Sequence, residues 1–374
     1  MSNTKPTYMH IVAFDVPFPP NYGGVIDVFY KLKKLSELGV KIHLHCFEYG
    51  RGRQDELLKY CYKVSYYKRN ISFKKVISKI PYIVKSRENE TLTQNLLKDN
   101  FPILFEGLHT TASLLNTDFG SRKVLIRTHN IEHYYYKGLY RSENKKRKKL
   151  FFKTEAKKLE KYENILKKAD YILSISPYEH EYFKKKYSTK TIYTPVFYDR
   201  ENNQLSESDT KFALWHGDLR VVDNVRAALE IIQIFSSLKH KLIIASNCRN
   251  KEVIESVAAY KNISFDSLET EGTLEKLISS AHVHPMITYQ KTGIKLKLLH
   301  ILSKGRFVVA NSLMVEDTGL EHLCSIANTK KEFTNSIEKL MNSDYSKCKQ
   351  EERMQTLEKF DTHITANKIV ELLK

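Results

Sequence analysis

Several features of secreted and membrane proteins are missing from this sequence. Its five cysteines include no C-x-x-C pair, and their odd number disfavours a disulfide scaffold. No apolar run approaches the roughly 20 residues of a membrane-spanning helix. Residues 1–17 also lack the basic-then-apolar order of a signal peptide. We therefore expect a cytoplasmic protein with reduced thiols that at most rests on the inner face of a membrane.

The common nucleotide and nucleic-acid motifs are also absent. The chain has no G-x-G-x-x-G, no Walker lysine, no zinc-finger spacing and no clear helix-turn-helix. The formal net charge of +18 on 374 residues nevertheless predicts anionic partners. Without a nucleic-acid motif, we expect phosphorylated small molecules or anionic lipid, and no nucleic acid.

Much of the positive charge lies in one segment, Arg141 to Lys168. Its sequence, RSENKKRKKLFFKTEAKKLEKYENILKK, is typical of a charged helix. The apolar positions of this pattern are Leu150, Phe151, Leu159, Tyr162, Ile165 and Leu166. One interpretation is a surface helix packed on its own domain. The alternative is a peripheral contact with the anionic head groups of a membrane.

Short apolar runs alternate with helical patterns along most of the chain. In the first half we expect strands at 9–14, 40–47, 102–105, 123–127 and 171–175, a helix at 25–38, and a mixed, largely helical stretch from 55 to 100. In the second half we expect strands at 211–216, 241–245, 263–265, 284–287 and 307–310, and helices at 224–235, 273–281 and 360–373. This order is typical of an α/β protein with two doubly wound domains.

The polar segment 196–210 has no periodicity, which predicts a linker. It would separate a first domain, 1–195, from a second, 211–357. Polar or glycine residues follow several strands, including Gly23 and Gly24 in the turn after the first strand. In doubly wound sheets ligands bind at that edge. We therefore expect two similar folds facing each other across a cleft.

One stretch in the second half has the pattern of an anion site. Residues 292–305, TGIKLKLLHILSKG, predict a glycine loop, a helix with Lys295 and Lys297 at its start, and Gly305 as the residue that ends it. Free amides at a helix N-terminus, a glycine and two lysines favour a bound phosphate. A solvated amphipathic helix is the alternative.

The order of these segments resembles the GT-B glycosyltransferases, in particular glycosyltransferase family 4. The resemblance rests on TGIKLKLLHILSKGRFVVA, on the GG of the first loop, and on RTHNIE, ISPYE, PVFYD and WHGDLRVVDN, which occur in the expected order over most of the chain. It implies two Rossmann-like domains, the second binding the nucleotide-sugar donor. It further implies that the C-terminal helix, about 358–374, packs back on the first domain.

The resemblance also implies roles for particular residues. The donor diphosphate, UDP- or GDP-linked, would meet a set of glycine and basic residues: Gly24, Gly217, Arg220, Gly293, Lys295 and Lys297. His129 would contact the transferred sugar, and Glu132 would orient Arg127 or the acceptor. Glu106 would serve as the base if the enzyme inverts, and His109 and Arg127 would lie on the acceptor side. The chain departs from the family at His300, where a ribose-binding glutamate is usual.

No metal or other cofactor is expected, because the chain has no Asp-x-Asp triplet of the kind that holds a divalent ion in the GT-A class. A rival motif overlaps the site, since His129, Glu132 and His133 match the H-x-x-E-H of inverted zinc proteases. A strand ending just before His129 disfavours the helical geometry that zinc would need.

The resemblance implies a glycosyltransferase that retains anomeric configuration and needs no metal. It would transfer a sugar to a saccharide or lipid-linked acceptor in surface polysaccharide or glycoconjugate synthesis. A nucleotide-sugar epimerase of the same fold, and a non-catalytic basic protein that binds membrane or nucleic acid, remain alternatives.

Overall fold

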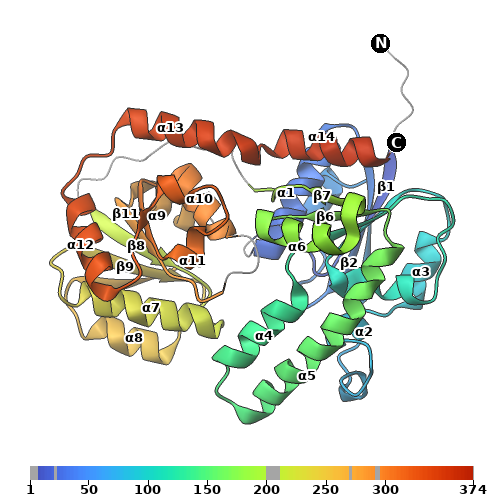
Figure 1. Cartoon of the computed structure of the whole chain (residues 1–374), viewed down its shortest axis with the longest axis horizontal. Coiled ribbons are helices and arrows are strands. Elements are labelled where there is room, and N and C mark those ends of the chain that lie inside the picture. The colour runs from blue at the N-terminus through green and yellow to red at the C-terminus, as the bar shows by residue number, and fades with distance from the viewer. Residues whose placement is uncertain (1–6, 21–22, 199–210, 269–271, 291–294, 374) are drawn as a thin grey trace. The chain divides into compact units, whose positions relative to one another are not determined.

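The structure is a computed structural model of the whole chain, and it describes residues 7–20, 23–198, 211–268, 272–290 and 295–373. The chain divides into two compact units (Figure 1). One unit holds the chain up to Tyr198 together with the segment from Phe360 onward, and the other holds the chain from Lys211 to Lys359 apart from 291–294.

The first unit is a parallel sheet of seven strands in the order β3-β2-β1-β4-β5-β6-β7. Its strands are β1 (Tyr8–Ala13), β2 (Lys41–Glu48), β3 (Lys63–Lys68), β4 (Ile103–Glu106), β5 (Val124–Thr128), β6 (Tyr171–Ser174) and β7 (Thr191–Tyr193). Its helices are α1 (Gly23–Glu37), α2 (Tyr82–Lys85), α3 (Glu90–Leu96), α4 (Glu132–Ser142), α5 (Lys146–Tyr162), α6 (Pro177–Tyr187) and α14 (Thr362–Leu373).

The second unit repeats this topology with the sheet order β10-β9-β8-β11-β12-β13. Its strands are β8 (Phe212–His216), β9 (Lys241–Ser246), β10 (Ile263–Ser267), β11 (Val283–Met286), β12 (Phe307–Ala310) and β13 (Ser325–Ile326). Its helices are α7 (Val222–Phe235), α8 (Lys251–Ala258), α9 (Thr273–Ser280), α10 (Leu296–Lys304), α11 (Ser312–Val315), α12 (Lys330–Met341) and α13 (Lys347–Leu357). Both orders are those of the Rossmann fold, which confirms the predicted fold class.

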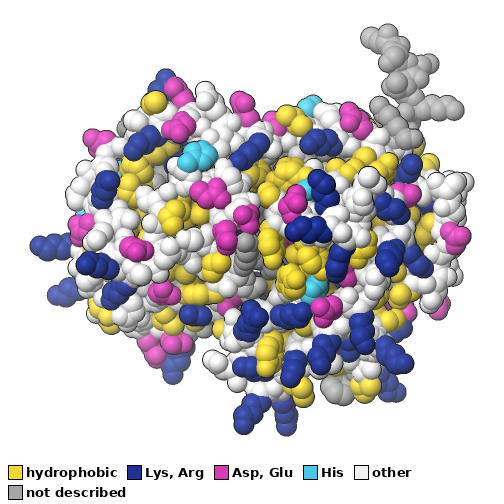
Figure 2. All heavy atoms as spheres, viewed as in Figure 1, with side chains coloured by type: hydrophobic (Ala, Val, Ile, Leu, Met, Phe, Trp, Pro, Cys, Tyr) yellow, Lys and Arg dark blue, Asp and Glu magenta, His cyan; other side chains and the backbone are white. Residues whose placement is uncertain are grey.

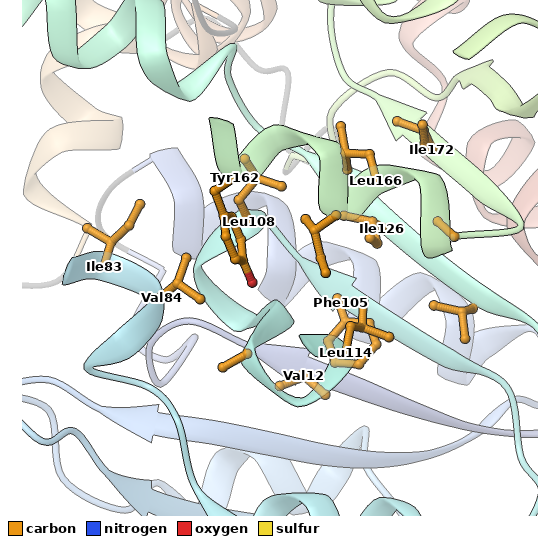
Figure 3. Packing of buried hydrophobic residues seen from close by; sticks show 14 of the residues in the cluster. Val12, Ile83, Val84, Phe105, Leu108, Leu114, Ile126, Tyr162, Leu166 and Ile172 are labelled. Carbon is orange, nitrogen blue, oxygen red and sulfur yellow. The ribbon is translucent and has the colours of Figure 1, made fainter. Parts of the chain in front are cut away.

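Alternating side chains of the central strands fill two cores in the first unit. On one face, Val12, Phe105 and Ile126 pack with residues of α2 and of the segment after α5, as Figure 3 shows. On the other face, Leu32 and Leu35 of α1 pack with Ala366 and Ile369 of α14. Burial on both faces explains why these strands are continuous apolar runs in the sequence.

Some sequence predictions for the first unit were wrong in detail. The stretch 55–100 contains an edge strand, β3, whose polar composition disguised it. The single charged helix expected from Arg141 is broken, because α4 ends at Ser142 and α5 begins at Lys146. Gly23 and Gly24 lie in the first turn of α1 rather than in a preceding loop. Among the described residues, no helix is long and apolar enough to cross a bilayer.

The boundary of the expected linker also differs at its start. Val196, Phe197 and Tyr198 are buried in the first unit, and the Phe197 amide donates to Asp27 Oδ1 at 2.8 Å. These residues therefore belong to the packed domain. The rest of the predicted linker, 199–210, lies outside the described residues.

Candidate functional site

A buried network of charges lies at the carboxyl edge of the first sheet. Arg127, at the end of β5, donates from Nε and Nη2 to the two oxygens of Asp27 on α1, at 2.7 and 2.8 Å. Lys31, one turn further along α1, donates to Asp27 at 3.0 Å and to Glu106 Oε1 on β4 at 2.6 Å. All four side chains are almost completely buried. The network ties α1 to the two strands beside it.

Arg127 has no donor left for a ligand. Besides Asp27, its guanidinium donates to Thr194 O at 3.1 Å, Thr194 Oγ1 at 2.7 Å and Pro195 O at 3.0 Å, which accounts for all five N–H groups. It is 0% exposed. The geometry therefore contradicts its predicted place on the acceptor side, and Arg127 instead holds the chain after β7. Asp27, not Glu132, orients it.

Glu106 holds His129 in place. Its Oε2 is 2.9 Å from His129 Nε2, while Oε1 accepts from Lys31. Burial by itself would raise the pKa of Glu106, but Lys31 and His129 lower it below its ordinary value. A carboxylate with both oxygens occupied and a lowered pKa is a poor general base. The geometry disfavours that role and favours a positioning role instead.

Glu132 is a different kind of carboxyl group. It is buried at the first residue of α4, and its Oε1 has no hydrogen-bond partner among the described residues. Burial raises its pKa to about 7, with a further contribution from Glu179. His109 is a neighbouring base, with its Nδ1 3.9 Å from Glu132 Oε1. A carboxyl group that titrates near neutral pH can exchange a proton, so Glu132 is the better candidate for acid–base chemistry in this unit.

His109 is also an unusual side chain. Its buried Nδ1 has no hydrogen-bond partner among the described residues, and burial together with Arg87 holds its pKa well below the ordinary value. Gly107 makes room for it, because a Cβ there would stand 2.8 Å from His109 Nδ1, and the backbone has a φ of +70°. His109 is therefore a neutral ring at this edge.

The zinc-protease motif does not form a metal site in this fold. His129 precedes α4, which begins at Glu132, so His129 and His133 do not share a helical face. His129 is bonded to Glu106, and His133 Nδ1 lies 3.3 Å from Glu163. Nearby, ligand atoms of Asp27, Glu106 and His129 come within 4.8 Å of one another, but Lys31 already donates to both carboxylates. A cation there would meet an ammonium group.

At the carboxyl edge of the second sheet, a lysine is hydrogen-bonded to a backbone carbonyl rather than to a carboxylate. Lys297, in the first turn of α10, donates to His216 O at the end of β8 at 2.5 Å and lies over the Trp215 ring at 5.0 Å. Burial lowers the pKa of Lys297 to about 8. A Cβ at Gly217 would stand 3.0 Å from Lys297 Nζ and 2.9 Å from the Trp215 ring. Glycine at this position therefore leaves room for the amine.

Of the other predicted donor-site residues, Lys295, Arg220 and His300 belong to the second unit, whereas Gly24 lies on α1 of the first. Lys295 is the residue just before α10 and donates to Gln290 O at 2.7 Å. Arg220, after β8, is paired with Asp218 at 2.7 Å and its side chain is 71% exposed. His300 is on α10, close enough to lower the pKa of His216. Gly293 lies outside the described residues.

Gly305 ends α10 for a reason other than the one predicted. Its φ of −106° and ψ of −174° are extended, not left-handed. A Cβ there would stand 2.5 Å from Nε2 of the buried His284 on β11 and 3.0 Å from Ile301 O. The position favours glycine because a side chain would collide with these atoms, not because the backbone is left-handed. His284 and His216 are neutral rings, since burial lowers the pKa of His284 to about 3 and that of His216 well below its ordinary value.

Sequence reasoning missed several residues of both edges. Asp27 and Lys31 have the i,i+4 spacing of an ordinary exposed helical ion pair, which gave no sign of burial. His216 and Trp215 lie at the end of a predicted strand, just before Gly217. Their position at the carboxyl end of a strand could have identified them as candidate site residues. His216 Nε2 is buried without a hydrogen-bond partner among the described residues.

No family model matches the chain. A curated relative, described as an uncharacterized 44.6 kDa protein in the cps region of Klebsiella pneumoniae, is 26% identical over 335 residues, covering 83% of this chain and 84% of that protein.

Solved structures match over nearly the whole length. TarM superposes with a TM-score of 0.71 at 12% identity, covering 100% of this chain and 99% of that chain. HepE of Anabaena, solved with UDP and glucose, gives 0.68 at 11%, covering 98% and 99%. A UDP-forming trehalose-phosphate synthase of Burkholderia xenovorans gives 0.65 at 9%, covering 98% and 100%. These neighbours are GT-B glycosyltransferases, and the chain has the GT-B fold.

Proposed function

We propose that this protein is a glycosyltransferase that uses a nucleoside diphosphate sugar, with UDP as the first nucleotide to test. The observation that carries the proposal is Lys297, a cation at the carboxyl edge of β8 whose amine donates a hydrogen bond to a backbone carbonyl. Neighbours of the same fold were solved with UDP or UDP-glucose, which supports a uridine donor. Family 4 membership and retention of configuration are further parts of the proposal.

The chemistry explains why a partly desolvated lysine would suit this position. When the bond to the sugar breaks, negative charge grows on the departing diphosphate. A fixed ammonium at the N-terminus of a helix stabilises that charge more in the transition state than in the ground state. Lys297, assisted by Lys295 and the amides of α10, would take the place of a metal ion. The acceptor would be a saccharide or lipid-linked saccharide of surface polysaccharide or glycoconjugate synthesis.

The test begins with thermal shift and calorimetry on the full chain with UDP, GDP, ADP and CMP. UDP should stabilise the protein, and Lys297→Met should weaken UDP binding and slow UDP-sugar turnover by roughly 30- to 1,000-fold. Lys276→Met, on the exposed surface of α9, is the control. No stabilisation by any nucleotide would contradict the proposal.

The protonation state of Lys297 gives an independent check. Because its pKa is about 8, UDP affinity should fall as the pH rises from 7 to 9.5, by up to about tenfold per pH unit above 8. The pH dependence should disappear in Lys297→Met. A wild-type profile that stays flat over this range would show that another group carries the interaction.

An epimerase of the same fold would also bind the nucleotide. Incubation of UDP-sugars without acceptor, followed by NMR of the sugar, separates the two activities. Epimer formation would contradict the transferase proposal, whereas transfer or slow hydrolysis supports it.

We further propose that one surface of the first unit rests on an anionic membrane. Figure 2 shows Lys and Arg side chains crowded over the region of α4 and α5. Within this basic surface Leu150 of α5 is 66% exposed. The neighbouring loop adds Ile71 and Ile77, 67% and 76% exposed, and is held to α5 by Lys158, which donates to Val76 O at 2.6 Å. Apolar side chains among lysines suit the interface of a bilayer.

Flotation with vesicles tests this contact. Wild-type protein should float with vesicles that contain phosphatidylserine and not with neutral ones. The combined change Lys146→Gln, Arg147→Gln and Lys149→Gln should lower the bound fraction, and Leu150→Gln should lower it further. Lys330→Gln with Lys331→Gln, on the second unit, is the control. Equal flotation of all variants would contradict the contact.

A further inference from the structure

Three histidines meet on one face of the first sheet. His10 on β1 pairs in register with His43 on β2, and His45 follows two residues later on the same face. One nitrogen from each ring lies within 4.8 Å of the others. His10 and His45 are fully buried, and His43 is partly exposed. The cluster shares the sheet face of Val12 and Phe47, whereas Glu106 is on the opposite face, with Leu104.

One nitrogen of each ring is within hydrogen-bond distance of a side-chain oxygen atom. His10 Nε2 is 2.8 Å from Asp99 Oδ1, and His45 Nδ1 is 2.8 Å from the Tyr67 hydroxyl. His43 Nε2 is 3.0 Å from Ser65 Oγ. The remaining nitrogens of His10 and His45, Nδ1 and Nε2, face each other at 2.9 Å. Metal-binding histidines show this arrangement, in which an outer partner fixes the ring while the other nitrogen faces the ion.

The rings are suited to coordination at neutral pH. An imidazole of ordinary pKa is largely uncharged above about pH 7, so each ring can offer a nitrogen lone pair to an ion. Asp99 accepts from His10 Nε2, which leaves His10 Nδ1 as an acceptor, so His45 Nε2 donates to it. Binding of an ion requires His45 to move this proton to its own Nδ1, where the Tyr67 oxygen can accept it.

We propose that His10, His43 and His45 form a binding site for a borderline divalent cation of the Zn²⁺ class. Three imidazole nitrogens favour Zn²⁺, Cu²⁺, Ni²⁺ or Co²⁺ over Mg²⁺ and Ca²⁺, which prefer oxygen ligands. The ion would join β1 to β2, and the partly exposed His43 gives it access from solvent. The competing explanation is a purely structural chain of hydrogen bonds, Asp99–His10–His45–Tyr67–Asn95.

His43 separates the two explanations, because it is a ligand in the first and lies outside the chain in the second. The full-length protein, purified without a histidine tag or chelator, is titrated with Zn²⁺ and followed by metal analysis, calorimetry and thermal unfolding. Wild type should bind one ion per chain and unfold at a higher temperature with Zn²⁺. Co²⁺ substitution should give visible d–d absorption.

Variants complete the test. His43→Gln should lose the high-affinity ion and the Zn²⁺-induced rise in unfolding temperature, while its metal-free unfolding temperature stays close to wild type. Asp99→Asn should weaken Zn²⁺ binding by roughly 10- to 100-fold, as loss of an outer partner does. His363→Gln, on the exposed side of α14, should leave binding unchanged. If wild type and His43→Gln bind Zn²⁺ alike, or neither binds it, the site is overturned and the structural chain stands.

Discussion

The carboxyl edges of the two sheets have the same strand topology, but their buried cations have different partners. In the first unit, Asp27, Lys31, Arg127 and Glu106 satisfy one another inside the protein. In the second unit, Lys297 is partly desolvated and donates to a carbonyl oxygen rather than to a carboxylate. A buried cation with a carboxylate partner is part of the scaffold. A desolvated cation that has no carboxylate partner carries an unfavourable desolvation free energy, and binding of an anionic ligand can offset it.

Within the first unit, two buried glutamates have pKa values shifted in opposite directions. Burial raises the pKa of Glu132 to about 7, whereas Lys31 and His129 overcome the effect of burial on Glu106 and lower its pKa. Both carboxyl groups are buried in the same unit. Glu106 is hydrogen-bonded directly to Lys31, whereas the effect of Arg87 on Glu132 is outweighed by burial. Direct contact with a cation therefore decides which of them can exchange a proton near neutral pH.

The largest effect is expected where the paired network is broken. Arg127→Met leaves the carboxylate of Asp27 buried, with Lys31 and the Phe197 amide as its remaining partners. The free energy of unfolding should fall by about 3–5 kcal/mol, measured by urea denaturation. Arg220→Met, at an exposed position in the second unit, should change it by less than about 0.5 kcal/mol. Similar losses in the free energy of unfolding for the two variants would show that the buried network of the first unit adds no more stability than an exposed ion pair.

Glu132 gives a pH-dependent stability effect. Its folded pKa of about 7 is raised above the unfolded value of 4.5, so the wild type loses stability as the pH rises between these values. Glu132→Gln should therefore gain up to about 3 kcal/mol relative to wild type between pH 4.5 and pH 8. Thermal unfolding at both pH values measures this, with the exposed Glu255→Gln as control. A constant difference would show that Glu132 does not titrate in this range.

Gly305→Ala tests the packing of the second unit. The new methyl group would stand 2.5 Å from His284 Nε2, so the ring or α10 must move. We expect a loss of about 1–3 kcal/mol in the free energy of unfolding. Gly52→Ala is the matched control, because nothing lies within 4 Å of a Cβ there. A neutral Gly305→Ala would show that His284 has room to move.

The smallest effect is expected at Arg220. Asp218 already pairs with its guanidinium, and the side chain is 71% exposed. Arg220→Gln should weaken UDP binding by less than about tenfold, since an exposed ion contact is worth roughly 1 kcal/mol or less. Calorimetry beside Lys297→Met gives the comparison. A loss at Arg220 as large as that at Lys297 would mean that Arg220 leaves Asp218 to bind the diphosphate.

Strands and helices of the fold could be predicted because burial on both faces of a parallel sheet leaves apolar runs in the sequence. The edge strand β3 escaped prediction, because an edge strand buries less and its KVSYYK is mostly polar. Likewise Lys297 was found from its place at a predicted helix N-terminus, but its contact with Trp215 and His216 was not. Those residues are 81 or more positions away along the chain.

The sequence by itself determined the alternation of strands and helices and the order of its glycine, lysine and histidine motifs, because these depend on local periodicity. Only the tertiary structure decided which charges face a ligand. Asp27 and Arg127, 100 residues apart, neutralise each other once α1 packs beside β5. His10 meets His43 and His45 only because β1 and β2 pair in that register. Charge and coordination depend on distances in space, and folding alone sets those distances.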